Sequence, residues 1–335
     1  MRGTRRRKRS VTLAAAVVSA ALTLGACGGS ASEYPSENFT WVVPYSPGGG
    51  FDVYSRGFAE VMSQTVLPDG INIAVENITP IAQALSQVYA AESGYTLAIL
   101  PMPAAAAQEI QFPDVAKWET ENFTILGSME ENAYVVYVAG DSPYQTWEDL
   151  ANTPGLKALT VERGSSSGLA TAVAIRSLGL DANLTFGAEG SQEVATALIR
   201  GDVDLIVYGT SDMIGFIESG DIRPLLFLGT EDQRPADYDW LANVPGAADV
   251  GFPELAGAVS EMRVIVAPAD IPDEQREWLE QAVAEVLFSE EFAEWAESAE
   301  RPIVPRDAAS TRDAMENQID TMRELVPQLA EEGLI

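Results

Sequence analysis

Short runs of β-branched and aromatic residues alternate with stretches of helical spacing through most of this sequence, and this alternation restricts the possible folds more than any other feature. The runs predicted to be strands cover residues 39–44, 71–75, 95–100, 134–138, 158–161, 183–186, 203–208, 222–228 and 263–267. Strands separated by helices in this way are typical of α/β proteins with mostly parallel sheets. With 335 residues, 47% of them hydrophobic, the chain has enough material for roughly two domains and a sizeable core.

Two of the intervening helices show a clear apolar side. In the helix predicted over residues 191–200, that side is formed by Val194, Ala197 and Leu198. Near the C-terminus, apolar residues recur at spacings of four and three, namely Met315, Ile319, Met322, Val326 and Leu329. We expect residues 310–313 to cap this second helix, Pro327 to end or kink it, and its methionines to serve in packing.

Missing side chains exclude several kinds of chemistry. The sequence has no histidine and one cysteine, so Ser–His–Asp and Cys–His catalysis, the usual His-containing metal sites, an internal disulfide and a thiolate cluster are all unavailable. We therefore expect no enzyme, no metal and no cofactor. A lyase or hydrolase that uses paired carboxylates such as Glu162 and Asp52 is the alternative.

Charge is distributed unevenly along the chain. Residues 1–26 hold six basic side chains and no acidic one, and the remainder holds 14 basic against 50 acidic side chains, a net charge of −36. A surface this negative repels phosphate backbones, so we expect no nucleic-acid partner. Solubility or a salty habitat accounts for the acidity itself.

The N-terminal basic cluster precedes an apolar run over residues 11–26. These 16 residues are fewer than the ~20 that span a bilayer, and they are typical of a secretory signal. The following Leu24-Gly25-Ala26-Cys27 resembles the lipobox of bacterial lipoproteins. We expect residues 1–26 to be a signal peptide, Cys27 to carry acyl chains that anchor the protein to the membrane, and residues 27–33 to be a tether. A generic secretory leader is the alternative.

A glycine-rich loop joins the first predicted strand to a helix. Its sequence is Tyr45-Ser46-Pro47-Gly48-Gly49-Gly50-Phe51-Asp52. Three glycines before a helix present unobstructed backbone N–H groups at the positive end of that helix, which suits an anion. The loop lacks the GK[ST] of a P-loop and the GxGxxG of dinucleotide binding. A tight strand-to-helix turn is the alternative.

A second loop of this kind lies more than 100 residues further on. It reads Gly164-Ser165-Ser166-Ser167-Gly168, and its three hydroxyls supply side-chain donors to a carboxylate beside those of the backbone. Simple N-capping is the alternative for any one of these serines. Ligands of open α/β sheets bind at the carboxyl ends of strands, where both loops fall. The two loops therefore predict two lobes that face one cleft.

The same loops belong to an ordered series of segments that resembles a known family. The series contains Tyr34-Pro35, the first loop, Val75-Glu76-Asn77, Gly94-Tyr95-Thr96-Leu97, the second loop, residues 197–204 and Val266-Ala267-Pro268. It is similar to the Bug-type extracytoplasmic receptors of tripartite tricarboxylate transporters over nearly the whole mature chain. This resemblance implies a type II periplasmic-binding-protein fold in which two α/β lobes, residues 34–132 plus 252–335 and residues 133–251, close on a small carboxylate.

The resemblance also implies roles for individual residues. The two loops would hold the ligand carboxylate, partly through water, and Asp52 would help to select the ligand, with capping of its own helix as the alternative. Where the family carries a basic residue, Pro and a Gly-Ala-Gly-Gly run, this chain has Ile78-Thr79-Pro80-Ile81-Ala82-Gln83. We expect Thr79 or Gln83 to replace the lost contacts, or the ligand to differ. Further walls of the cleft are expected from residues 100–103, which include Met102, and from residues 208–212, which include Thr210, Ser211 and Asp212.

These observations together predict a monomeric, lipid-anchored receptor outside the cytoplasm. It would capture a small organic acid by hinge closure and deliver it to the permease subunits of a tripartite transporter. A ligand-presenting receptor for a signalling system, without transport, is the alternative.

Overall fold

The computed structural model describes residues 34–335 apart from 236, 237 and 257. The expected signal peptide, the lipobox with Cys27 and the tether therefore lie outside the described residues. The positions of the strands follow the predicted runs closely, and helices lie between them.

The first sheet has the strand order β10-β4-β9-β3-β1-β2. Strand β1 pairs in parallel with both β2 and β3, whereas β9 pairs antiparallel with β3 and β4. This departs in part from the expected mostly parallel sheet. The strands are β1 (Phe39–Val43), β2 (Ile73–Asn77), β3 (Thr96–Met102), β4 (Thr124–Ala139), β9 (Ser260–Ala267) and β10 (Arg306–Asp307).

Helices cover both faces of this sheet because successive strand residues point to opposite sides. Trp41 belongs to a core cluster with α1, α8 and α9, whereas its neighbour Val42 belongs to the cluster that contains α2, α3 and α10. These helices are α1 (Gly50–Thr65), α2 (Ile81–Tyr89), α3 (Ala104–Gln111), α8 (Asp273–Leu287), α9 (Glu290–Ser298) and α10 (Ala308–Glu331).

A second group of elements is built around the far end of β4. There β4 pairs antiparallel with β7 and β8, while β5 and β6 form a parallel pair. The strands are β5 (Leu156–Thr160), β6 (Ala182–Phe186), β7 (Ile206–Gly209) and β8 (Ile222–Phe227). The helices are α4 (Trp147–Ala151), α5 (Ser166–Ser177), α6 (Ser191–Ile199) and α7 (Thr210–Glu218).

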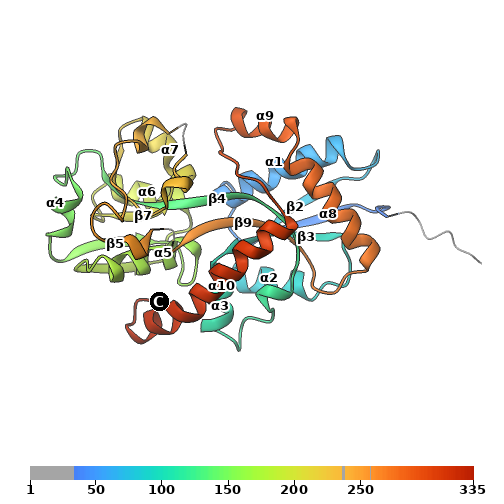
Figure 1. Cartoon of the computed structure of the whole chain (residues 1–335), viewed down its shortest axis with the longest axis horizontal. Coiled ribbons are helices and arrows are strands. Elements are labelled where there is room, and N and C mark those ends of the chain that lie inside the picture. Colours follow the sequence, from blue (N-terminus) through green and yellow to red (C-terminus); the bar gives the residue numbers. More distant parts are fainter. Residues whose placement is uncertain (1–33, 236–237, 257) are drawn as a thin grey trace, which may run out of the picture. The chain divides into compact units, whose positions relative to one another are not determined.

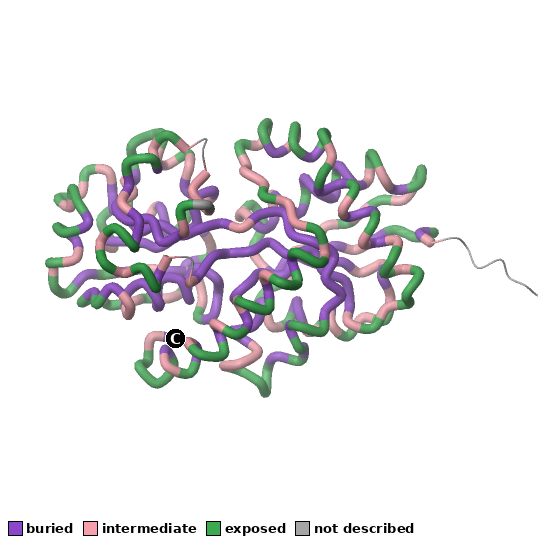
Figure 2. The backbone as a smooth tube through the Cα atoms, in the orientation of Figure 1, coloured by how far each residue is buried: buried purple, intermediate pink, exposed green. Residues whose placement is uncertain are grey.

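Strands β4 and β9 run side by side between the two groups, as Figure 1 shows, and both are buried along nearly their whole length (Figure 2). Their pairing ends at Ala133, which lies opposite Ser260, and from Tyr134 onward β4 pairs with β7 and β8. The strand predicted over residues 134–138 corresponds only to the second half of β4. The first half contains Gly127, Glu130 and Asn132, residues that are uncommon in strands.

The C-terminal helix differs from the sequence predictions at its N-cap and at Pro327. Asp307 is its N-cap, with a carboxylate that accepts a hydrogen bond from Ser310 N, so residues 310–313 lie inside the helix rather than capping it. Pro327 does not end the helix, which continues to Glu331. The packing of Val326 and Leu329 in the core holds this last turn in place. The predicted packing role of Met315 and Met322 is confirmed, since both are buried.

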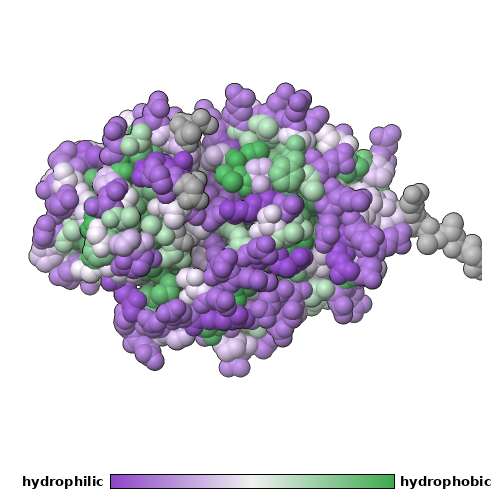
Figure 3. Space-filling model, in the orientation of Figure 1, coloured by the Kyte–Doolittle hydropathy of each residue, from purple (hydrophilic) through white to green (hydrophobic). Residues whose placement is uncertain are grey.

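Hydrophilic residues predominate on the face of the molecule shown in Figure 3, where apolar residues form separate small patches. Among the described residues, no helix is both long enough and apolar enough to cross a membrane.

Candidate functional site

A cavity of about 310 Å³ lies where the carboxyl ends of β1, β5 and β7 approach β9. Its lining comes from both groups of elements and consists of residues 45–51, Val161, Ser167, residues 189–193, Tyr208, Asp212, Glu261 and Arg263. The two glycine-containing loops therefore meet at one cavity, although 117 positions separate Gly50 from Ser167. A volume of this size suits a small molecule.

The first loop is held open by the side chain that follows it. Asp52 accepts a hydrogen bond from Gly48 N at 2.9 Å and another from Asn77, and it forms an ion pair with Arg56. Burial opposes ionisation of Asp52, but these donors outweigh it and lower the pKa of the carboxyl. Asp52 does not line the cavity; it lies in the first turn of α1 and holds Gly48, the residue before the N-cap Gly49.

The N–H groups at the start of α1 are left free by this arrangement. No acceptor among the described residues takes the N–H of Gly49, Gly50 or Phe51. All three residues line the cavity. The first turn of α1 therefore offers donors to an anion at the positive end of a 16-residue helix.

The three serines at the start of α5 differ in position: one caps the helix, one lines the cavity and one is buried outside the lining. Ser165 is the N-cap: its Oγ accepts a hydrogen bond from Gly168 N at 3.1 Å and donates to the Glu162 carbonyl. Ser167 lines the cavity, and its Oγ accepts a hydrogen bond from Thr160. Ser166 is buried outside the lining. Helix α5 has no acidic side chain in its first turn, so its positive end is not neutralised locally.

Two further helices begin at the same cavity. Residues 189–193 run into α6, where the Glu193 carboxylate accepts a hydrogen bond from Glu189 N. Asp212 lies in the first turn of α7. The N-termini of α1, α5, α6 and α7 thus meet at one cavity, and of these only α5 has no acidic side chain in its first turn to offset its partial positive charge.

Asn132, in β4, fixes the start of α7. Its Oδ1 accepts a hydrogen bond from Thr210 Oγ1 at 2.7 Å, and its Nδ2 donates to Ser211 Oγ at 2.9 Å. The Ser211 carbonyl accepts a further hydrogen bond from Arg301. Thr210 and Ser211 therefore position α7 rather than line the cavity, whereas Tyr208 and Asp212 of the predicted wall reach it.

Arg263 forms the floor of the cavity and is surrounded by carboxylates. The side chain is fully buried, and its guanidinium forms ion pairs with Glu130, with Glu261 at 2.9 Å and with Asp212 at 3.4 Å. Its Cζ also lies 4.9 Å from the centre of the Phe51 ring. This cluster joins β4, β9 and α7. Among the described residues, no group of acidic side chains is arranged to hold a metal ion.

One guanidinium is shared among three carboxylates, and two of these are buried deeply enough for their pKa values to rise. Burial raises the pKa of Glu130 to about 7, although Arg263 pulls in the opposite direction. Burial likewise raises the pKa of Glu261 to about 7. The same carboxylates hold the pKa of Arg263 well above its usual value, so the guanidinium stays charged.

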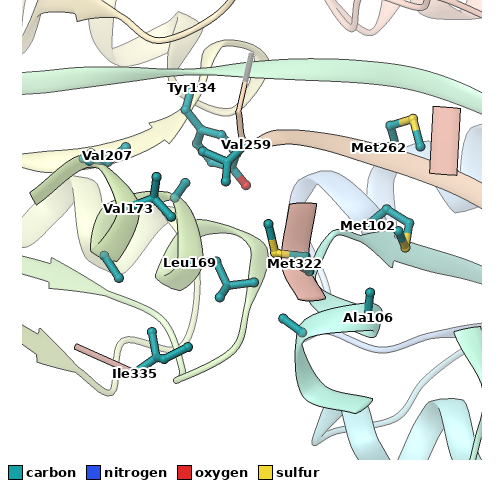
Figure 4. Packing of buried hydrophobic residues seen from close by; sticks show 14 of the residues in the cluster. Met102, Ala106, Tyr134, Leu169, Val173, Val207, Val259, Met262, Met322 and Ile335 are labelled. Atoms are coloured by element: carbon teal, nitrogen blue, oxygen red, sulfur yellow. The ribbon is translucent and has the colours of Figure 1, made fainter. Parts of the chain in front are cut away.

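Several predicted contact residues lie away from the cavity. Met102 is fully buried in the core, where Figure 4 shows it in one cluster with Met262 and Ala106, so it forms no apolar wall. Thr79 is exposed, and neither it nor Gln83 lines the cavity. Gly164 has a positive φ of 75° and accepts a hydrogen bond from Gln108, which makes it part of the turn. Gly168 is also absent from the lining, because the Glu162 carbonyl occupies the space beside it.

Sequence reasoning missed the acidic cluster and residues 189–193. One signal was present: Glu261 and Arg263 are two residues apart in a strand, so both point to the same face. A buried strand with two charged residues on one face indicates that partners lie opposite. The partners themselves, Glu130 and Asp212, are too distant in the sequence for any spacing rule.

The fold and the cavity define a class of protein. Two α/β groups connected by paired strands, with helix N-termini at a cavity between them, are the type II periplasmic-binding-protein fold. Two solved structures share it. One is the periplasmic binding protein BugD, 20% identical with a TM-score of 0.74, covering 89% of this chain and 99% of that one. The other is an R. palustris protein solved with adipate, 21% identical with a TM-score of 0.75, covering 89% and 98%.

Sequence comparison gives the family. The family model described as "Tripartite tricarboxylate transporter family receptor" matches residues 51–330, and this chain belongs to that family. An Agrobacterium vitis protein described as "UPF0065 protein in the TAR-I ttuE-ttuC' intergenic region" is 26% identical over 262 residues, which cover 76% of this chain and 72% of that protein. The resemblance found in the sequence is therefore confirmed. The chain is a substrate-binding receptor by family, not a member of an enzyme family.

Proposed function

We propose that this receptor captures a small organic carboxylate outside the cytoplasm, is anchored to the cell membrane by lipid on Cys27, and passes its ligand to the permease subunits of a tripartite transporter. The observation that carries the proposal is the convergence of four helix N-termini on one cavity, with the N–H groups of Gly49, Gly50 and Phe51 unused. The adipate bound in the R. palustris relative is a dicarboxylate, which supports this ligand class.

Capture would proceed by hinge closure. The ligand contacts the start of α1 on one side and that of α5 on the other, so it favours the closed state over the open one. We assign residues 34–132 and 252–335 to one lobe and residues 133–251 to the other. The end of the β4–β9 pairing at Ala133 and Ser260 supports a hinge at this level.

Gly49→Val is expected to remove carboxylate binding while leaving the fold intact. Gly49 has φ −77° and ψ 171°, extended values that suit valine, and a Cβ there would meet only the Ser46 carbonyl, at 3.8 Å. Since Gly49 lines the cavity, the added side chain occupies ligand space. Calorimetric titration with adipate, succinate and citrate measures the effect.

Gly215→Val is the matched control, because Gly215 lies on α7 with open space around it and outside this cavity. Its affinity for the bound acid is expected to equal that of the unchanged chain. Unaltered affinity in Gly49→Val, or the same loss in both variants, would contradict the proposed site.

Cys27→Ser is expected to release the receptor from the membrane, since several acyl chains give stable anchoring and their loss leaves none. The chain is expressed with its leader in a bacterium and partitioned between detergent and aqueous phases, with radioactive palmitate as the label. Detergent-phase recovery of the Cys27→Ser variant, or absence of label from the unchanged chain, would show that no lipid is attached there.

A further inference from the structure

The cavity has two walls of opposite electrostatic character. The first consists of the free N–H groups of Gly49, Gly50 and Ser167, for which no acceptor lies in the described part of the chain. The second consists of the carboxylates of Asp212 and Glu261, two of the acidic residues that line the cavity. The first wall attracts negative charge and the second attracts positive charge.

Arg263 cannot neutralise the acidic wall. Its single positive charge is shared among Asp212, Glu261 and also Glu130, which lies behind the cavity. No other Lys or Arg side chain lines the cavity within the described residues. At the surface that faces the ligand, the acidic wall therefore has two carboxylates and only one guanidinium, which Glu130 also shares.

One oxygen of Glu261 is ion-paired but can still accept a hydrogen bond. The residue is only 6% exposed, and its Oε2 accepts a hydrogen bond from Tyr134. Its Oε1 is buried and accepts no hydrogen bond from any described residue, although it lies 2.9 Å from Arg263 Nη2. Buried carboxylate oxygens normally accept hydrogen bonds, so this oxygen has capacity for a donor from the ligand.

The two walls lie close together. A Cβ placed on Gly50 would lie 2.6 Å from Arg263 Nη2 and nearer still to Asp212 Oδ1. The start of α1 therefore packs directly against Asp212 and Arg263, so a ligand that contacts both the N–H groups and the carboxylates needs its two charges only a few bonds apart.

We propose that the cavity selects a small organic acid that also carries an ammonium group. Its carboxylate accepts hydrogen bonds from Gly49, Gly50 and Ser167, and its ammonium group donates to Asp212 and Glu261. A plain dicarboxylate of similar size would bring its second negative charge against this wall, where Arg263 is already shared. This inference rests on the proposed function and narrows its ligand class.

Matched acids with and without an amino group test the inference. The full-length chain in detergent is titrated calorimetrically with succinate and aspartate, glutarate and glutamate, and butyrate and 4-aminobutyrate. In at least one pair the aminated acid is expected to bind tenfold or more tightly than its partner. Asp212→Asn is expected to reduce that ratio at least tenfold, by weakening the aminated acid and strengthening the plain one.

Asp69→Asn is the matched control, because Asp69 is exposed in the loop before β2, at the opposite end of the parallel strands. It removes the same charge and is expected to leave the ratio unchanged. Glu261→Gln provides a second variant with the same expected direction should Asp212→Asn fail to fold.

The outcomes separate this inference from the proposed function. Plain acids that bind as tightly as aminated ones, or an equal change of ratio in Asp212→Asn and Asp69→Asn, would overturn the ammonium site and leave a carboxylate receptor. If no acid of either kind binds, carboxylate capture fails, and the ammonium site fails with it.

Discussion

Replacing Arg263 with methionine is expected to destabilise the fold by about 3–5 kcal/mol, because removal of one partner from a buried ion cluster leaves its carboxylates uncompensated. Here three carboxylates, those of Glu130, Asp212 and Glu261, would lose their shared guanidinium. Methionine fills much of the volume, so the loss is mainly electrostatic. Urea denaturation followed by circular dichroism measures the free energy of unfolding.

The loss of unfolding free energy in R263M is expected to depend on pH. Burial already raises the pKa of Glu130 above its unfolded value, so its stabilising contribution is present in acid and declines as the pH rises through about 7. Without Arg263 the pKa rises further, and the cost of ionising the carboxyl at high pH increases. The difference in unfolding free energy between R263M and the unchanged chain should therefore be smaller at pH 5 than at pH 8.

Arg323→Met is the matched control. Arg323 forms ion pairs with Glu121 and Asp320, but its side chain is 54% exposed, so solvent screens these pairs and little change is expected. If R263M loses no more unfolding free energy than Arg323→Met, or if its loss does not vary with pH, the buried carboxylates do not depend on Arg263 for charge compensation.

Gly50→Ala is expected to weaken ligand binding by about 5–150-fold, the equivalent of the ~1–3 kcal/mol that overpacking costs. The added Cβ would collide with Asp212 and Arg263, which hold the start of α7 against the start of α1. The two cavity walls would be forced apart. Calorimetry with the tightest-binding acid gives the affinity, and a thermal melt gives the stability.

Gly215→Ala provides the comparison, since a Cβ at Gly215 meets nothing within 4 Å. Alanine is also the better helix former, so this variant should bind normally and melt no lower than the unchanged chain. Normal affinity in Gly50→Ala would mean that Asp212 and Arg263 move aside freely, against the close packing seen here.

Local sequence patterns were sufficient to predict the positions of most strands and of the two glycine-containing loops. Residues such as Trp41 and Val42 alternate between two buried faces, which gives a strand its continuous apolar run, and glycines mark the turn into α1. The first half of β4 was missed for a physical reason. Glu130 and Asn132 are buried there because Arg263 and the start of α7 need them, and these partners are remote in the sequence.

The predicted contact residues that lie outside the cavity lining share a cause with that omission. Met102 follows the strand predicted over residues 95–100, as a cavity residue would, but β3 continues to Met102, and the helices packed against the strand decide which face is open to ligand. Asp52 and Ser165 could cap or bind, and only coordinates show that their oxygens are used by Gly48 and Gly168. As contacts to a ligand, the loop residues that line the cavity remain predictions.

The register of β4 and β9 has an evolutionary consequence. Ala133 and Ser260 lie directly opposite each other in that pairing. The segment between them therefore joins the rest of the chain at two neighbouring positions. A segment with adjoining ends can be exchanged for its homologue by recombination at two sites, without rethreading the rest. Chimaeras joined at these positions would combine the α1 half of one receptor's specificity with the α5–α7 half of another's.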